Sequence, residues 1–247
     1  MFCGDMNESR FPVAILAGGV ATRLRPLTEA IPKALVEIAG EPFLAHQLRL
    51  LKEQAIEQVV ICTGYLGEMI EEWLGHCGSM GLRVTCSPDG PNLLGTAGAI
   101  RQALPLLGEC FFVLYGDSYL SCDYRAIQEE FTRSAKSGLM TLCRNEGQWD
   151  TSNVEFEGGR ILVYDKRNRT PRMKHIDYGL GVFRASAFSA VSEGLTHDLA
   201  QVYQDLLAHD DLAAFEVSGR FYEIGSFAGM RELDEHLTSR RAALEQR

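Results

Sequence analysis

One short segment near the start of the chain holds the residues best suited to binding phosphate groups. Residues 14–35, AILAGGVATRLRPLTEAIPKAL, contain a glycine pair directly after an apolar run, then two arginines and a lysine: Gly18, Gly19, Arg23, Arg25 and Lys33. A glycine pair lets a ligand lie against bare backbone, and the amides that follow can form an anion-binding concavity. The order of residues matches neither the G-x-G-x-x-G dinucleotide fingerprint nor the G-x-x-x-x-G-K-[ST] phosphate loop. Because Arg23 and Arg25 flank Leu24, we expect only one of them to face the same ligand.

A carboxylate offers a second kind of chemistry. Asp117 follows the apolar run CFFVLYG (110–116), where it would serve either as a turn residue or as a metal ligand. The seven cysteines form no C-x-x-C pair, and the six histidines show no H-E-x-x-H spacing. We therefore expect free, mostly buried thiols in a reducing compartment, with neither a disulfide framework nor a zinc site. The sequence contains no convincing Ser-His-Asp or Cys-His arrangement for nucleophilic catalysis.

The composition limits the partners of the chain. Its 247 residues are 46% hydrophobic and 23% charged, which is typical of a soluble globular protein with a substantial core. The net charge of -9 argues against binding of nucleic acid or an anionic membrane, since those partners usually meet a basic surface. The first residues lack the apolar core of a secretory signal, and no apolar run reaches membrane-spanning length. We expect a single-domain cytoplasmic protein that binds phosphate only locally.

Strands and helices alternate in the first half of the chain. Short apolar, β-branched runs predict strands at 13–16, 58–63, 82–87, 110–116 and 139–144. Amphipathic stretches between them predict helices at 43–54, 67–75, 95–107 and 124–137. Strand, helix, strand at this spacing is typical of a doubly wound, mostly parallel sheet. Such sheets bind ligands at the carboxyl ends of their strands, so the residues that follow each apolar run are the candidates for function.

The second half of the chain has a different pattern. Alternating apolar residues at 152–167 predict a hairpin that turns at Gly158 and Gly159. Further elements are predicted as a strand at 176–184, helices near 185–191 and 198–208, short runs at 213–219 and 220–226, and a helix from about 226 to 245. No linker, internal repeat or low-complexity segment interrupts this order, which favours a single domain.

The segment LAGGVATRLRPLTEAIPKAL resembles the signature of the sugar-1-phosphate nucleotidylyltransferases, L-A-G-G-x-G-T-R-L-x-P-L-T followed by P-K. Four more family landmarks follow in order: LLGTAGAIRQAL (93–104), LYGDSYL (114–120), VYDKR (163–167) and FYEIGSF (221–227). The resemblance extends from Val13 to the last helix. It implies an α/β fold with a Rossmann-like, doubly wound, mostly parallel mixed sheet of the nucleotide-diphospho-sugar transferase type and a small sugar-binding β lobe. The single domain, residues 1–247, would comprise a nucleotide-binding part at about 11–120, a sugar-phosphate-binding part at about 121–225 and a C-terminal helix at about 226–245.

The resemblance also implies roles for individual residues. On the nucleotide side, the residues expected under the nucleoside or beside the base are Leu16, Ala17, Gly18, Gly19, Gly95 and Gly98. Arg23 would contact the departing pyrophosphate, and Lys33 would neutralise the phosphates at the reacting centre. Asp117 and Glu223 would hold Mg²⁺, and Lys166 would hold the phosphate of the sugar 1-phosphate. The residues expected beside the sugar are Asn153, Glu155, Asp165 and Asp177.

The implied reaction explains why these residue types are needed. An oxygen of the sugar 1-phosphate must attack the α-phosphorus of a nucleoside triphosphate, although both reactants are anions. Mg²⁺ and cationic side chains would bring the two together, align the oxygens in line and neutralise the charge that develops on the leaving pyrophosphate. A phosphate monoester is already a nucleophile near neutral pH, so the reaction needs no general base.

Three features depart from the family pattern. Ala21 replaces the usual glycine of the phosphate loop, so we expect a backbone there without positive φ. Glu223 replaces the usual aspartate and is one methylene longer, which would shift the metal or the strand slightly. Ser152 and Asn153 stand where many relatives have glycine beside the sugar, and the common proline after the lysine motif is absent. The last feature indicates an altered sugar pocket.

The sequence leaves the substrates open. The segment LGTAGAI is more similar to that of mannose-1-phosphate and heptose-1-phosphate guanylyltransferases than to that of thymidylyl enzymes. From the length of the sequence we expect a short form, without the C-terminal β-helix of longer relatives. We therefore favour GTP with a heptose or mannose 1-phosphate. Similar short forms include muramic-acid-1-phosphate uridylyltransferases, so UTP or dTTP is the alternative. A catalytically weak, regulatory paralogue that binds nucleotide sugars is a second alternative, and assembly as a homo-oligomer is left open.

One basic run, DKRNRTPRMK (165–174), stands out in the acidic chain. It is either a solvated loop or, in part, a guide for the anionic sugar phosphate. The side chains concerned are Arg167, Arg169 and Arg172.

Overall fold

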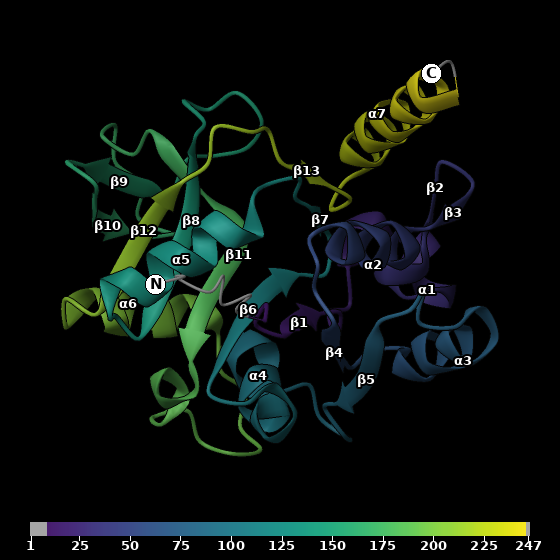
Figure 1. Cartoon of the computed structure of the whole chain (residues 1–247), viewed down its shortest axis with the longest axis horizontal. Coiled ribbons are helices and arrows are strands. Elements are labelled where there is room, and N and C mark those ends of the chain that lie inside the picture. Colours follow the sequence, from purple (N-terminus) through teal and green to yellow (C-terminus); the bar gives the residue numbers. More distant parts are fainter. Residues whose placement is uncertain (1–8, 246–247) are drawn as a thin grey trace, which may run out of the picture.

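The computed structural model describes residues 9–245 and confirms the α/β fold with a mixed, mostly parallel sheet (Figure 1). The centre of the sheet is four parallel strands in the spatial order β5-β4-β1-β6, which are Arg83–Pro88, Gln58–Thr63, Val13–Leu16 and Cys110–Tyr115. The chain adds strands first on one side of β1 and then on the other, so the sheet is doubly wound. The carboxyl ends of β1 and β6 therefore flank the position at which such sheets bind ligands.

Alternate side chains of the central strands bury both faces of the sheet. In β1, Val13 and Ile15 join one hydrophobic cluster, while Ala14 joins the cluster on the opposite face. The first face is covered by α2 (Phe43–Glu53), α3 (Gly67–Cys77) and α5 (Tyr124–Ser134), and the second by α4 (Gly95–Leu107) and α6 (Leu199–Ala208). Burial on both faces explains why the sequences of β1 and β6 are continuously apolar. The edge strand β5, RVTCSP, is mostly exposed or half-buried and lacks this pattern.

The second half of the chain adds the antiparallel part of the sheet. β11 (His175–Arg184) pairs antiparallel with β6 and with β8 (Gly138–Arg144), and β12 (Leu212–Glu216) runs parallel to β8. The predicted hairpin is β9 (Val154–Glu157) and β10 (Arg160–Tyr164), joined by Gly158 and Gly159 with positive φ. This hairpin and β11 form the small β lobe that the resemblance implied.

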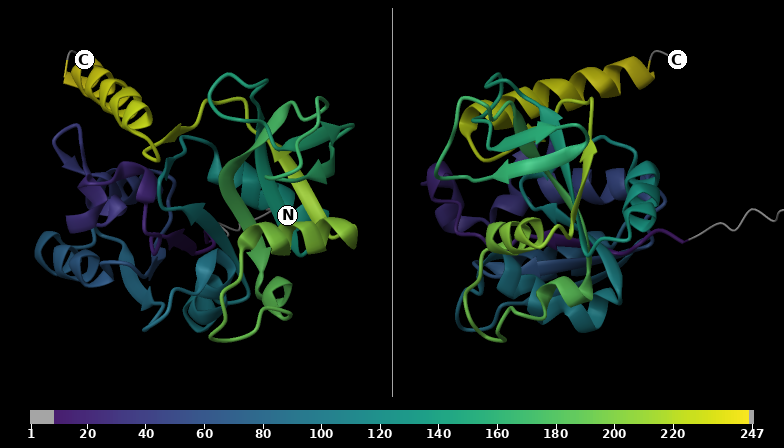
Figure 2. Two further views of the ribbon diagram at one scale, coloured as in Figure 1. Left: turned by 180° about the vertical axis from the view of Figure 1, so that it is seen from behind. Right: turned by 90° about the vertical axis from the view of Figure 1, so that its left-hand side faces the viewer.

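Short elements connect the sheet to the two ends of the fold. After β1 come η1 (Thr22–Leu24), α1 (Leu27–Ala30), η2 (Lys33–Leu35) and the pair β2 (Glu37–Ile38) and β3 (Glu41–Pro42). β7 (Ser118–Tyr119) pairs with β13 (Tyr222–Glu223), and α7 (Phe227–Glu245) follows as the predicted C-terminal helix. Figures 1 and 2 show α7 at the edge of the molecule, with its first turns beside β13 and its C-terminal end pointing away from the sheet.

Two helix predictions need correction. The helix expected near 185–191 is only a 3₁₀ turn, η3 (Ala185–Phe188). Its single anchor is Phe188, which is fully buried and packs against the Phe183 ring with centroids 5.3 Å apart, so tertiary packing rather than helical periodicity places the apolar residue. The helix expected at 124–137 ends at Ser134, because Ala135 adopts a left-handed conformation with φ of 55°.

The six cysteines of the described part of the chain are free thiols, as predicted, and Cys3 lies outside the described residues. The expectation of mostly buried thiols is wrong, because only Cys62 and Cys143 are buried. Burial raises the pKa of the Cys62 thiol to about 12, which keeps it protonated and unreactive. Within residues 9–245, no helix combines the length and the apolar character needed to cross a membrane.

Candidate active site

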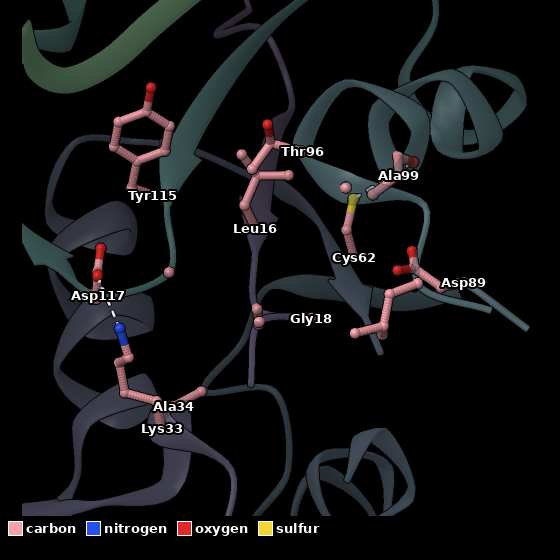
Figure 3. Close-up of a pocket in the computed structure, with 15 residues that line it drawn as sticks. Leu16, Gly18, Lys33, Ala34, Cys62, Asp89, Thr96, Ala99, Tyr115 and Asp117 are labelled. Carbon is pink, nitrogen blue, oxygen red and sulfur yellow. Dashed lines mark hydrogen bonds and ion pairs between the residues drawn. The ribbon is translucent and has the colours of Figure 1, made fainter. Parts of the chain in front are cut away.

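A cavity of about 320 Å³ opens at the carboxyl ends of β1 and β6 (Figure 3). Of the residues predicted at the nucleotide or the metal, the structure brings the following into its lining: Leu16, Ala17, Gly18, Gly19, Lys33, Gly95 and Asp117. Gly98 lies outside this lining. A Cβ on Gly98 would stand 2.7 Å from the Leu195 carbonyl oxygen, so the structure gives this glycine a packing role.

Close backbone packing explains the first glycine of the pair after β1. A Cβ on Gly18 would stand 3.2 Å from the Gly64 amide nitrogen, and the Gly18 carbonyl accepts a hydrogen bond from the Tyr65 N–H at 3.1 Å. Gly19 has no such neighbour within 4 Å. Its backbone therefore stays open to the cavity that it lines.

The prediction for Ala21 is wrong, because this residue has a positive φ. Its φ and ψ are 50° and 46°, in the left-handed region that glycine adopts without strain. The turn is fixed from within the loop: the Ala21 carbonyl accepts hydrogen bonds from the Leu24 N–H at 3.1 Å and from Thr28 Oγ1 at 2.9 Å. The loop thus keeps the backbone conformation usual for glycine, and Ala21 adopts it at a cost in conformational energy.

A cation and a carboxylate meet at the end of the cavity. Lys33 Nζ lies 2.9 Å from Asp117 Oδ2, and both side chains are about one-quarter exposed or less, at 19% and 26%. Lys33 is held by η2, and Asp117 follows β6 after Gly116. Figure 3 shows the two side chains pointing toward each other on one side of the cavity. The sequence predicted both residues, and the fold brings them together from distant segments.

Glu223 is placed beside Asp117 by the β7–β13 pair. Ser118 pairs with Glu223 in this pair, and the Ile224 N–H donates to the Asp117 carbonyl at 2.9 Å. Burial raises the pKa of Glu223, and the negative charges of Asp117 and then Asp150 raise it further. The two carboxylates therefore occupy one electrostatic environment, in which a cation would be favoured.

Arg23 supplies positive charge on the Glu223 side. The Arg23 guanidinium lies close to Gly225, since a Cβ added to that glycine would be only 2.8 Å from Arg23 Nη2. The charge of Arg23 lowers the pKa of Glu223 and so opposes the effect of burial. Arg23 is exposed and is not part of the cavity lining, so its contact with pyrophosphate stays a prediction. Arg25 is exposed, as expected for the second arginine of the loop.

Asp117 and Glu223 are the residues that would hold a magnesium ion, with phosphate oxygens as further ligands. Among residues 9–245, no group of three or more His, Cys, Asp or Glu side chains is arranged to hold a metal. Mg²⁺ commonly takes only one or two protein carboxylates, with phosphate oxygens and water completing its shell. Asp117 and Glu223 provide two hard oxygen donors that already lie close to each other's charge.

A second cavity, of about 240 Å³, lies on the β-lobe side of Asp117. Both cavities are lined by Tyr115 and Asp117, so they meet at these two residues. The residues predicted near the sugar or the metal that line this second cavity are Asn153, Lys166, Asp177 and Glu223. Of the basic run, Arg169 also lines it, whereas Arg167 is exposed and outside the lining.

Two residues predicted beside the sugar have other partners. Glu155 is buried, and its Oε1 accepts hydrogen bonds from Thr170 Oγ1 and, at 3.2 Å, from Arg172 Nε, while Arg172 Nη2 forms an ion pair with Oε2 at 3.1 Å. Asp165 accepts hydrogen bonds from the Arg167 and Asn168 backbone N–H groups at 2.7 and 2.9 Å. These hydrogen bonds lower the pKa of Asp165, those from Asn168 most. Both carboxylates shape the 165–174 loop and lie outside the cavity lining.

The sequence reasoning missed Tyr115 and Asp89. Asp89 is 8% exposed and lines the first cavity, and its Oδ2 accepts a hydrogen bond from the Leu94 N–H at 3.0 Å. Its Oδ1 is buried without a hydrogen-bond partner in the described structure. Burial raises the pKa of Asp89, although the Leu94 hydrogen bond opposes this rise. Its place directly after β5, at a carboxyl end of the sheet, was the signal that could have revealed it.

Residues 13–153 match the family model described as nucleotidyl transferase. The chain is 29% identical over 231 residues to the N-acetylmuramate alpha-1-phosphate uridylyltransferase of Neisseria meningitidis, covering 88% of this chain and 94% of that relative. It is 28% identical over 217 residues to the mannose-1-phosphate guanyltransferase beta-B of Xenopus laevis, covering 85% of this chain. The chain spans 60% of the length of that second relative.

Solved structures share the fold. HddC from Yersinia pseudotuberculosis, complexed with GMP-PN, aligns with a TM-score of 0.77 and 21% identity over 92% of this chain and 99% of its own. The UDP-glucose pyrophosphorylase of Acinetobacter baumanii aligns with a TM-score of 0.71 and 17% identity over 96% of this chain and 100% of its own. These likenesses agree with the doubly wound sheet and its β lobe.

Proposed function

The chain belongs to the nucleotidyl transferase family, and from that premise we propose that it uses GTP and Mg²⁺ to convert a sugar 1-phosphate of the heptose or mannose type into a GDP-sugar and pyrophosphate. The observation that carries this proposal is the meeting of two cavities at Asp117, with Lys33 on the first and Lys166 on the second. A nucleotide in the first cavity and a sugar phosphate in the second would present their phosphates to each other at that junction.

The chain's own side chains supply orientation and charge. An oxygen of the sugar 1-phosphate attacks the α-phosphorus, and the bond from that phosphorus to the leaving pyrophosphate breaks. Lys166 binds the attacking phosphate, while Lys33 and Arg23 neutralise charge on the triphosphate. When Mg²⁺ is bound by Asp117 and Glu223, it supplies further neutralisation of the phosphate oxygens. The attacking group is already an anion, so the side chains need not remove a proton.

The preference for GTP is supported by Asp89. A carboxylate only accepts hydrogen bonds, and Asp89 lines the first cavity, although its Oδ1, which has no hydrogen-bond partner among the described residues, is itself buried. Guanine presents two adjacent donors, its ring N–H and its exocyclic amino group, whereas uracil and thymine present one N–H between two carbonyl oxygens. The carboxylate therefore suits guanine better. The guanyltransferase relative and the HddC complex support GTP, and the uridylyltransferase relative supports the alternative, UTP.

The test of the function is a matrix of pyrophosphate release. GTP, UTP and dTTP are each paired with mannose, glycero-manno-heptose, N-acetylmuramate and glucose 1-phosphates, with Mg²⁺ and with a chelator. We expect the highest kcat/KM for GTP with mannose or heptose 1-phosphate, and no turnover in the chelator. If no pair of nucleoside triphosphate and sugar 1-phosphate were turned over and the chain still bound nucleotide sugars, the proposal of an enzyme would be wrong. That result would favour the regulatory paralogue.

Asp89→Asn tests the choice of base. The amide keeps the shape of the side chain but replaces an acceptor by a donor, so we expect kcat/KM for GTP to fall about 10- to 100-fold, with a smaller change for UTP. Asp205→Asn, the same chemical change at an exposed position of α6, is the control and should leave both values unchanged. An unaltered ratio of GTP to UTP activity in Asp89→Asn would remove Asp89 from base recognition.

A further inference from the structure

The Lys166 ammonium is surrounded by groups from three strands. Its Nζ lies 3.4 Å from the Tyr115 hydroxyl and 3.7 Å from Asp177 Oδ2. It also lies over two aromatic rings, 5.2 Å from the Tyr115 centroid and 5.8 Å from the Tyr164 centroid. The Lys166 side chain is 43% exposed, and at that exposure a lysine usually moves freely in water. Here the hydroxyl, the carboxylate and the two rings favour a position of its charge beside Tyr115 and Asp177.

Asp177 is the centre of this arrangement. Its side chain is 3% exposed, and Oδ2 accepts hydrogen bonds from the Tyr115 hydroxyl at 3.0 Å and the Tyr164 hydroxyl at 3.1 Å. Oδ1 accepts from the Gly179 N–H at 3.0 Å. A buried carboxylate needs such donors and a nearby cation to offset the loss of water. Because both oxygens have protein donors, the structure favours a structural task for Asp177 over direct hydrogen bonding to a sugar hydroxyl.

Tyr115, Tyr164 and Asp177 connect the two parts of the active site. Tyr115 is the last residue of β6 and stands two positions before Asp117, and Tyr164 is the last residue of β10 and stands two positions before Lys166. Asp177 lies on β11, where the register shifts between Asp177 and Gly181. Figure 3 shows the Tyr115 hydroxyl pointing away from Asp117 and Lys33. The hydrogen bonds to Asp177 thus join the strand that carries the metal carboxylate to the hairpin that carries Lys166.

We propose that Tyr115, Tyr164 and Asp177 are positioning residues that fix the Lys166 ammonium, and with it the sugar phosphate, relative to Asp117. This inference rests on the proposed function. In-line attack is sensitive to small displacements of the reacting groups, so a lysine held at one point would contribute both to binding of the sugar phosphate and to turnover. Neither tyrosine needs to touch the substrate for this role.

Tyr115→Phe and Tyr164→Phe test the proposal, because each removes one hydroxyl and keeps the ring. The assay is steady-state kinetics with GTP and mannose 1-phosphate, or with the most active pair of the matrix above. We expect the KM for the sugar 1-phosphate to rise about tenfold and the KM for the nucleotide to stay within about twofold, as suits a lost hydrogen bond to a charged group. Equal increases in both KM values, or none, would overturn the proposal.

A double-mutant cycle separates positioning from general structural damage. In a Lys166→Met background, Tyr115→Phe should raise the sugar-phosphate KM no further, because the hydroxyl acts through the lysine. Additive effects of the two changes would overturn the proposal while leaving the proposed function intact. If the wild-type chain turned over no pair at all, the proposed function itself would fail, so the two failures are distinguishable.

Tyr124→Phe is the matched control. Tyr124 is fully buried on α5 and packs against Phe112 of β6 with ring centroids 5.2 Å apart. Its hydroxyl has no hydrogen-bond partner in the described structure and lies outside the linings of both cavities. The change should therefore leave both KM values unchanged. A shift of the sugar-phosphate KM in Tyr124→Phe as large as in Tyr115→Phe would contradict a specific role for Tyr115.

Discussion

At the scale of single residues, Ala21 shows how a backbone conformation can be kept without the residue that favours it. An alanine at φ of 50° costs about 1–2 kcal/mol in the left-handed region, whereas glycine adopts it freely. Glycine also has more freedom in the unfolded chain, which offsets part of this gain. We expect Ala21→Gly to raise the free energy of unfolding by about 0.5–1 kcal/mol, measured by urea denaturation.

An alanine-to-glycine substitution within a helix should change the free energy of unfolding in the opposite direction. Ala126 lies in α5 with ordinary helical geometry, so Ala126→Gly should lower the free energy of unfolding by about 1 kcal/mol. If both variants were destabilised equally, the left-handed geometry of Ala21 would be refuted. If Ala21→Gly also retained the KM for the nucleotide, the alanine would matter for stability alone.

Sequence motifs revealed residues but not their partners. Lys33 was predicted at the phosphates and Asp117 at the metal, but neither motif predicted their 2.9 Å contact. The family resemblance implied that Glu155 lies beside the sugar, yet Arg172 and Thr170 use both of its oxygens. Side-chain partners depend on which segments the fold brings together, and one motif read alone carries no such information.

At the scale of elements, the central strands were the most predictable because both of their faces are buried. β1 and β4 have the predicted bounds, Val13–Leu16 and Gln58–Thr63, and the apolar residues within them are almost all buried. The failure at η3 has the opposite cause. Phe188 is the only buried residue of that turn, and one buried position leaves no periodic pattern in the sequence.

Gly95 gives a prediction for the start of α4. Its φ is 70°, and a Cβ there would stand 2.6 Å from the His197 carbonyl oxygen. That carbonyl accepts a hydrogen bond from the Ala97 N–H at 2.9 Å, so the 195–197 segment cannot withdraw without losing the bond. We expect Gly95→Ala to lower the free energy of unfolding by more than about 1 kcal/mol and to raise the nucleotide KM, measured by urea denaturation and kinetics.

A second glycine gives the contrasting case. Gly75 lies on the exposed side of α3, and a Cβ there would meet no atom within 4 Å. Gly75→Ala should raise the free energy of unfolding by about 0.5–1 kcal/mol, since alanine is the better helix former. A Gly95→Ala variant as stable as Gly75→Ala would mean that the loop over α4 adapts easily.

At the scale of the whole molecule, the C-terminal helix supports a site built from both ends of the chain. Glu223 reaches Asp117 through the β7–β13 pair, and a separate hydrophobic cluster lies behind this pair. The cluster joins the two short strands to α2 and α7 through Phe43, Leu50, Tyr119, Ile224, Leu233 and Ile38. Asp234 Oδ1 accepts a hydrogen bond from the Ala39 N–H, at 2.6 Å, which adds a polar contact between α7 and the N-terminal half.

Leu233→Ala therefore tests whether α7 is part of the folded unit that carries Glu223. Leu233 is fully buried, and a leucine-to-alanine change at such a site costs about 2–5 kcal/mol because a cavity remains. We expect a loss of about 3 kcal/mol, seen as a Tm lower by roughly 6–12 °C for a domain of this size. Glu235→Ala, at an exposed position on the same helix, should change the free energy of unfolding by less than about 0.5 kcal/mol. Equal Tm values for the two variants would show that α7 unfolds independently, and the carboxylate pair would then depend on β7 and β13 alone.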